Sequence, residues 1–192
     1  MIMFKNVSYG GKKRQLKLNN CSVDLGEHSI LIGNTKSELR ELASVLTGRI
    51  KIDGGEVIGD LNSLPHTIDV SNPFLLRHLS VDKIVNKLSK KNSMRMDIWD
   101  KVPKYEQFDQ LPNHQKLIVL VEIARLQGKE VVILLCPEDD LSFKQLPLFE
   151  SYLKEIKDIS LLLLTTKEYW NDRLKHYSLL YLTNGQFSIE RR

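Results

Sequence analysis

Hydrophobic residues in the first quarter of the chain follow first a strand-like and then a helical spacing. Residues 1–9 and 16–25 alternate loosely between apolar and polar positions and are separated by glycines, which predicts two antiparallel strands. The run SILIG at 29–33 is continuously apolar, as expected of a strand buried on both faces. From Ser37, apolar residues recur with helical spacing as far as Gly48, which is predicted to end the helix.

The second half of the chain alternates regularly between helices and apolar strands. Helical spacing covers residues 113–127, with Asn113 as a suitable N-cap, and again residues 143–157. Each helix is followed or preceded by an apolar run, VVILL at 131–135 and ISLLLLTT at 159–166. A short helix is predicted at 168–174 and a hairpin at 177–190, where Asn184-Gly185 is a strong turn signal. Strands alternating with helices predict a parallel sheet.

Two further segments complete the predicted architecture. Residues 53–58 and 64–74 predict strands, the second leading into a proline-broken loop, and residues 80–101 predict one or two short helices. We therefore expect an α/β fold formed by residues 1–192 as a single domain. Its core and N-terminal antiparallel β lobe comprise residues 1–74 and 128–192, and a helical lobe comprises residues 75–127.

Composition limits the classes of protein that this chain can represent. With 42% hydrophobic and 27% charged residues, it can form one well-buried domain and is too short for two ordinary ones. No apolar run approaches the roughly 18 to 20 residues of a membrane span, and residues 1–11 are too polar for a secretory signal. Cys21 and Cys136 lack a zinc-binding spacing, so we expect reduced thiols, no metal site and a cytoplasmic location.

The charge pattern does not favour nucleic acid as a partner. The net charge is +4, and the basic stretches lie at 11–14 and 87–95. Neither stretch interleaves aromatic residues with Lys or Arg, as a single-strand binding platform does. We expect both to be solvated faces and expect no nucleic-acid partner.

The segment at 28–58 has the outline of a phosphate loop without the residues that bind phosphate. In G-x-x-x-x-G-K-[ST], backbone N–H groups cradle the phosphates, the Lys reaches the terminal ones and the hydroxyl holds Mg²⁺. The first glycine is Gly33, and the spacing then places Glu38, Leu39 and Arg40 where Gly, Lys and Ser/Thr belong. The remaining loop positions are Asn34, Thr35, Lys36 and Ser37.

Glu38 is expected to oppose a triphosphate at this loop. Two unit charges 4 Å apart repel by roughly 4 kcal/mol at the effective dielectric of a protein surface. Lys36 is expected inside the loop rather than at the start of the helix, so it is not expected to replace the missing lysine. The segment predicts a loop that does not bind nucleotide.

The order of elements and several unremarkable positions resemble the nucleotide-binding subunit of ABC transporters, the ATP-binding cassette. The similar segments are FKNVSYG at 4–10, LTGRIKIDGGEV at 46–57 and NGQFSIE at 184–190. The resemblance covers nearly the entire chain and does not depend on catalytic residues. It implies a P-loop NTPase-like, three-layer fold with an antiparallel β lobe and a reduced helical lobe.

The resemblance also implies where the second acidic motif lies. Members of the family carry Asp and Glu before a proline, where Asp supports Mg²⁺ and Glu polarises the attacking water. Alignment through Pro137 places Leu135 and Cys136 at these positions. Neither residue is a ligand for hard Mg²⁺ or an efficient carboxylate base. Glu138 or Asp139 could substitute in a shifted alignment, or could form an acidic turn ahead of a helix.

The other motif positions also lack the residues that are typical of the family. The signature loop falls at 111–115, where the glycines that allow phosphate to approach a helix N-terminus are missing. The loop glutamine corresponds to Asn72 and the switch histidine to Thr166, while Tyr9 represents either the adenine-stacking aromatic or a structural tyrosine. The five signature positions are Leu111, Pro112, Asn113, His114 and Gln115.

These positions together predict a non-catalytic ABC-type subunit without bound ATP or Mg²⁺. The resemblance implies a transmembrane permease, an active ABC-type subunit or both as partners, in a homodimer or heterodimer peripheral to the inner face of the cell membrane. The permease-docking positions are expected at Asn72, Phe74, Leu75 and Leu76, which could equally pack inside the lobe. Two alternatives remain: a divergent weak ATPase that uses Glu138 or Asp139, and a soluble scaffold without a membrane partner.

Overall fold

The computed structural model describes residues 2–9, 16–18, 21–23, 28–59, 65–68, 78–89, 101–183 and 186–190. The chain forms two compact units. The sheet unit contains Met1–Thr67, Glu130–Cys136 and Ser160–Arg192, and the helical unit contains Ile68–Lys129 and Pro137–Ile159. The expected docking positions at 72–76 and the hairpin turn at 184–185 lie outside the described residues.

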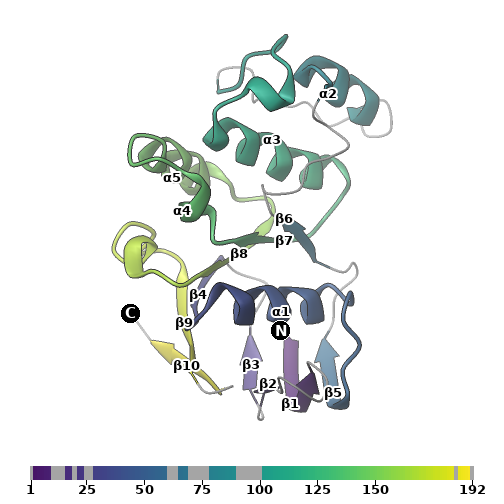
Figure 1. The fold of residues 1–192 in the computed structure, drawn as a ribbon, viewed down its shortest axis with the longest axis vertical. Coiled ribbons are helices and arrows are strands. Elements are labelled where there is room, and N and C mark those ends of the chain that lie inside the picture. The colour runs from purple at the N-terminus through teal and green to yellow at the C-terminus, as the bar shows by residue number, and fades with distance from the viewer. Residues whose placement is uncertain are drawn as a thin grey trace. The chain divides into compact units, whose positions relative to one another are not determined.

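A small antiparallel sheet forms the predicted N-terminal β lobe (Figure 1). Its central strand, β1 (Ile2–Tyr9), pairs with β2 (Leu16–Leu18), β3 (Cys21–Val23) and β5 (Gly54–Gly59). The β1–β5 register shifts between Lys5 and Ser8, where Asn6 has a φ of 49°. Opposite this irregularity, Gly55 has a φ of +82°, and a Cβ built on it would lie 2.4 Å from the Asn6 carbonyl oxygen.

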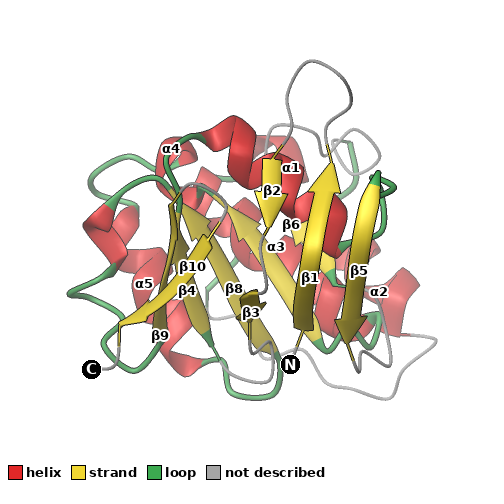
Figure 2. Cartoon of the chain, turned by 90° about the horizontal axis from the view of Figure 1, so that it is seen from below, coloured by secondary structure: helices red, strands yellow, loops and turns green. Residues whose placement is uncertain are grey.

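The main sheet has six strands in the order β10-β9-β4-β8-β7-β6 (Figure 2). Its neighbouring strands β9, β4, β8 and β7 are parallel, and β10 is antiparallel to β9, so the predicted parallel sheet and final hairpin are confirmed. The strands are β4 (Ser29–Ile32), β6 (His66–Ile68), β7 (Val131–Leu135), β8 (Ser160–Thr165), β9 (Ser178–Thr183) and β10 (Gln186–Glu190).

Helix α1 (Lys36–Leu46) supplies one wall of the core of the sheet unit. Its buried residues form one apolar face, which packs in a cluster with side chains from β4, β7, β8 and β9. Burying one leucine or valine side chain of this face contributes roughly 1.5–3 kcal/mol to the stability of the fold. Gly48, with a φ of 68°, follows the helix and ends it as predicted. The apolar face consists of Leu39, Leu42, Ala43, Val45 and Leu46.

The helical unit contains four α-helices among the residues that the structure describes. Helix α3 contacts both α2 and α5. The segment 137–159 belongs to this unit, although the sequence prediction had grouped it with the core. The helices are α2 (Val81–Ser89), α3 (Asn113–Leu126), α4 (Pro137–Asp140) and α5 (Leu146–Glu155). A 3-10 helix, η2 (Phe108–Gln110), lies between α2 and α3 in the sequence.

Two predicted helices are shorter in the structure than their apolar spacing suggested. Helix α5 begins at Leu146 rather than at Phe143, because Ser142 and Gln145 close a turn in which the Ser142 N–H donates to Gln145 Oε1. Phe143 is 84% exposed and therefore contributes nothing to the helix face that the pattern assigned to it. The helix predicted at 168–174 is only a 3-10 turn, η3 (Glu168–Trp170).

Gly55 and Gly128 form a matched pair for testing the β-lobe geometry. Both have positive φ, but a Cβ on Gly55 meets backbone, whereas one on Gly128 has nothing within 4 Å. We predict that Gly55→Ala lowers the free energy of unfolding by at least about 3 kcal/mol, because clash adds to strain. Gly128→Ala is expected to cost about 1 kcal/mol. Urea unfolding measures both, and equal losses would contradict the close approach of β5 to β1.

Candidate functional site

The connection between β4 and α1 is much shorter than a phosphate loop. Only residues 33–35 lie between the end of the strand and Lys36, the first residue of the helix. The prediction that Lys36 lies inside the loop was therefore wrong, and the helix starts one residue before the predicted Ser37. The N–H of Gly33 donates to the carbonyl of Thr165 at the end of β8, at 2.9 Å. Positions 36–40 of the motif are helical and no longer form a cradle.

A reciprocal cap between Thr35 and Glu38 explains the early start of the helix. Thr35 has extended backbone geometry, and its Oγ1 accepts a hydrogen bond from the Glu38 N–H at 3.2 Å. In return, the backbone N–H groups of Asn34 and Thr35 donate to the Glu38 carboxylate. This is a capping box, in which a hydroxyl and a carboxylate three residues later satisfy the first donors of a helix.

The pKa of the Glu38 carboxyl reflects effects that act in opposite directions. Burial raises the pKa of its carboxyl, and the hydrogen bonds from Asn34 and Thr35 lower it by less, while Glu41 raises it further. The net result is a raised pKa. The sequence prediction treated Glu38 only as a source of repulsion and missed its capping role, although the pattern Thr-x-x-Glu at 35–38 is a readable signal for it.

Leu39, at the position of the motif lysine, is part of the core. Its side chain is fully buried, and a Cβ built on Gly33 would lie 2.7 Å from Leu39 Cδ2. Gly33 is therefore required for close packing of the helix on the strand end. Asn34, Ser37 and Arg40 are exposed. No lysine side chain extends from position 39 toward the place where phosphate would bind.

The end of β7 is apolar and buried at both positions of the acidic motif. Leu135 is 4% and Cys136 0% exposed, and both belong to the same core cluster as Leu39. Cys136 has a left-handed φ of 44°, and its N–H donates to the Leu164 carbonyl at 2.7 Å. The site therefore offers a thiol inside the core where metal coordination needs a carboxylate.

The acidic residues after Pro137 form a single helical turn ahead of α5. Residues 137–140 form the short helix α4, and Glu138 is only 6% exposed. The alternative in which Glu138 or Asp139 replaces the missing carboxylates stays a prediction.

Thr166 follows β8 at the position of the switch histidine. It is half-buried and carries no imidazole. The turn that contains it is closed by Thr165, whose Oγ1 accepts from the Lys167 N–H at 3.0 Å. Tyr9 ends β1 as predicted and pairs with Leu16, but its side chain and Asn72 lie outside the described residues.

The signature positions form the start of α3. Pro112, not Asn113 as predicted, is the N-cap, and it has no side-chain hydrogen bond to the helix. Asn113 is instead the first helical residue, and its Nδ2 donates to the Asp140 carbonyl at 2.6 Å. Leu111 is buried at 3% exposure. A helix still starts here. However, Pro112 and the side chains of Asn113 and His114 stand where the resembled family has glycines that let phosphate approach the backbone.

Two buried polar atoms remain near this helix start. Within the described residues, His114 Nδ1 and Gln115 Oε1 have no hydrogen-bond partner. Burial lowers the pKa of His114, so the neutral imidazole is favoured. The Nε2 group of Gln115 donates to the Lys101 carbonyl at 2.9 Å. This carbonyl contact fixes the amide within the helical unit.

The residues of these motifs do not fit Mg²⁺ and a nucleoside triphosphate. In the part of the chain that the structure describes, no group of three or more His, Cys, Asp or Glu side chains could hold a metal ion. Two loop donors, the N–H groups of Asn34 and Thr35, are bonded to Glu38, and the motif positions for Lys and Asp are buried leucines. No helix among the described residues is both long and apolar enough to span a bilayer.

Comparison with solved structures identifies the fold. A nucleotide-free ATP-binding cassette from an ABC transporter has a TM-score of 0.68 and 18% identity over 100% of this chain and 91% of its own. A dimeric bacterial ABC transporter cassette has a TM-score of 0.67 and 15% identity, covering 100% and 97%. An ATP-binding subunit of an ABC transporter has 0.69 and 16%, covering 98% and 90%.

At the level of sequence, no protein-family model and no curated protein matches the chain. The structural matches extend over nearly all of it, and they confirm the predicted α/β architecture with a small antiparallel lobe. The chain therefore has the fold of the ATP-binding cassettes of ABC transporters.

Proposed function

We propose that the protein is a pseudo-ATPase: a non-catalytic subunit with the ABC cassette fold that acts by binding other proteins. Its partners would be a membrane permease, an active ATP-binding subunit, or both, and its role structural or regulatory. The observation that carries the proposal is the Thr35–Glu38 capping box, because it uses the loop donors that would otherwise bind phosphate.

Three effects at the loop act together against nucleotide binding. The first N–H groups already donate to a carboxylate of the same chain. That carboxylate, when ionised, would repel a phosphate by roughly 4 kcal/mol at 4 Å. Leu39 removes the attraction of a lysine, because its buried hydrocarbon side chain carries no charge. A bound triphosphate would have to break the helix cap as well as overcome the repulsion.

The residues at the hydrolytic positions support the same proposal. Phosphoryl transfer in this fold depends on carboxylates that hold Mg²⁺ and orient the attacking water. Leu135 and Cys136 are core residues, and Thr166 has no group that titrates near neutral pH. Even with a weakly bound nucleotide, the chain would lack an evident base.

The signature positions extend the proposal to mixed dimers. In the cassette family that this chain resembles, ATP lies between the loop of one subunit and the signature of the other. Pro112, Asn113 and His114 would impair the site that an intact partner contributes, and the capped loop would impair the other. The retained fold would then serve as a surface for binding proteins, at the inner face of the membrane where the partner is a permease.

Nucleotide binding to the isolated full chain tests the proposal. We predict that calorimetry with Mg-ATP detects no binding, corresponding to a dissociation constant weaker than about 1 mM, because the loop donors are occupied. A cassette with an intact loop, measured under the same conditions, is the positive control. Micromolar affinity would contradict the proposal and favour the divergent ATPase.

Association with a permease tests the partner half of the proposal. We predict that Phe74→Asp combined with Leu76→Asp reduces co-purification of the permease from native membranes by about tenfold or more, because an apolar anchor is lost. Leu148→Asp is the matched control, since Leu148 is an exposed apolar residue at 55% on another segment. Undiminished association with an intact fold would refute docking at 72–76, and a protein that never fractionates with membranes would favour the soluble scaffold.

A further inference from the structure

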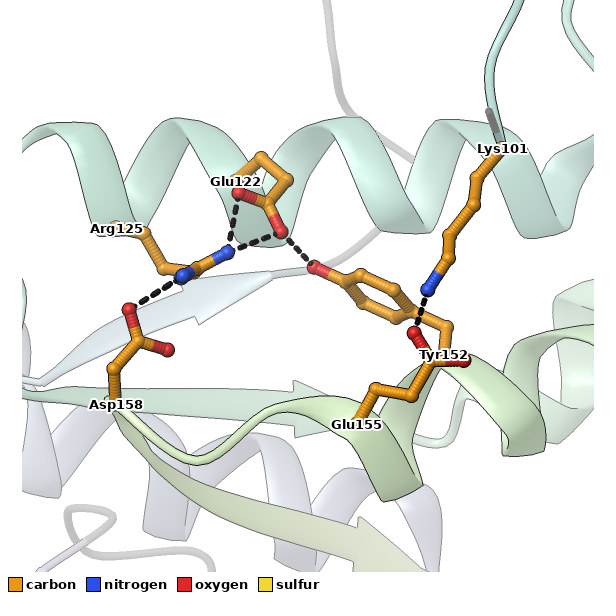
Figure 3. Close-up of polar contacts among 6 residues, drawn as sticks. All are labelled: Lys101, Glu122, Arg125, Tyr152, Glu155 and Asp158. Carbon is orange, nitrogen blue, oxygen red and sulfur yellow. Dashed lines mark hydrogen bonds and ion pairs between the residues drawn. The ribbon is translucent and has the colours of Figure 1, made fainter. Parts of the chain in front are cut away.

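A chain of polar contacts runs through the helical unit and joins four segments of the sequence. Its members lie on α3 and α5 and in the segments that flank them; Glu155 and Asp158 are exposed, and the others are buried or half-buried. Figure 3 shows all of them except Gln115. We call this set the polar chain. It consists of Lys101, Gln115, Glu122, Arg125, Tyr152, Glu155 and Asp158.

The centre of the polar chain is the buried carboxylate of Glu122, which is 3% exposed. The Tyr152 hydroxyl donates to Glu122 Oε1 at 2.7 Å, and one guanidinium nitrogen of Arg125 donates to both carboxylate oxygens at 2.6 Å. Burial and the neighbouring Glu122 raise the pKa of Tyr152, which keeps the phenol as a donor. A buried carboxylate is costly unless it is paired and hydrogen-bonded, so each contact here is needed.

One end of the polar chain lies in the segment that follows α5. The Nε of Arg125 donates to Asp158 Oδ2 at 3.0 Å, and a second guanidinium nitrogen pairs with the same carboxylate. Burial opposes the charge of Arg125, but its hydrogen bonds to Asp158 and Glu122 outweigh this and raise its pKa. The guanidinium thus links α3 to the residue two positions before β8.

The other end lies at the first turn of α3. Lys101 forms an ion pair with Glu155 at the end of α5, and its Nζ lies 5.4 Å from the centre of the Tyr152 ring. Through its backbone carbonyl, Lys101 accepts the hydrogen bond from Gln115 Nε2. Figure 3 shows Lys101 reaching from its own segment to Glu155 beside Tyr152.

We propose that the polar chain is a conformational lock: it holds the first turn of α3 and the segment after α5 in one arrangement, and breaking its centre loosens both ends. Polar networks in a low-dielectric interior are cooperative, and removing one member leaves another buried group unsatisfied. The lock is a property of the helical unit and goes beyond the proposed function. It rests on the proposed function only for the expectation that residues 111–115 face a partner.

Amide hydrogen exchange on the full chain tests the lock, with Tyr152→Phe as the variant that removes only the central hydroxyl. We expect exchange of residues 113–117 and of residues 156–159 to accelerate by about tenfold, because the buried Glu122 Oε1 then keeps only its hydrogen bond from Arg125 and local opening costs less free energy. Lys154→Met is the matched control, since it breaks only the Lys154–Glu150 pair on the same helix. Acceleration confined to residues next to position 152, or none at 113–117, would overturn the proposal.

A second variant keeps the test decisive if Tyr152→Phe does not fold. Asp158→Asn preserves the shape of a partly exposed side chain at one end of the polar chain. The lock predicts faster exchange at the opposite end, residues 113–117, by at least about threefold. Unchanged exchange there in the folded variant would refute it. Neither measurement uses a nucleotide or a partner, so its failure is distinct from failure of the proposed function.

Discussion

The start of α1 depends on the reciprocal cap between Thr35 and Glu38, and the character of the whole site follows from it. By satisfying the first donors of the helix, the cap lets helical geometry begin at Lys36, directly after a three-residue connection. The helix then directs Leu39 into the core, where it packs on Gly33. The connection between strand and helix is thus a helix turn closed by its own carboxylate.

Residues at three positions of the expected nucleotide motifs contribute to the packing of the fold. Leu39, Leu135 and Cys136 stand at motif positions that carry charge, and all three lie in the apolar cluster between α1 and the sheet. A charged group at any of them would need a ligand or a partner in this environment. The apolar side chains instead add to core packing.

Much of the fold was predictable from the sequence, because its longest elements have clear periods. The continuous apolar runs of β7 and β8 and the helical spacing of α3 appeared almost at their observed bounds. Periodicity failed where an apolar residue is exposed, as at Phe143, and where a cap decides the helix start, as at Lys36. The contact between Glu122 and Tyr152 joins residues 30 positions apart, and no local pattern signals it.

The measurement that tests the central claim most directly is an NMR pH titration of the Asn34 and Thr35 amides, with and without Mg-ATP. If Glu38 occupies these donors, both amide resonances will follow the protonation of its carboxyl, with a pKa above the ordinary 4.5. They will not follow it in Glu38→Gln, and Mg-ATP at about 1 mM will leave them unmoved. The claim would be contradicted if these amide resonances did not follow the protonation of Glu38 and shifted on addition of Mg-ATP.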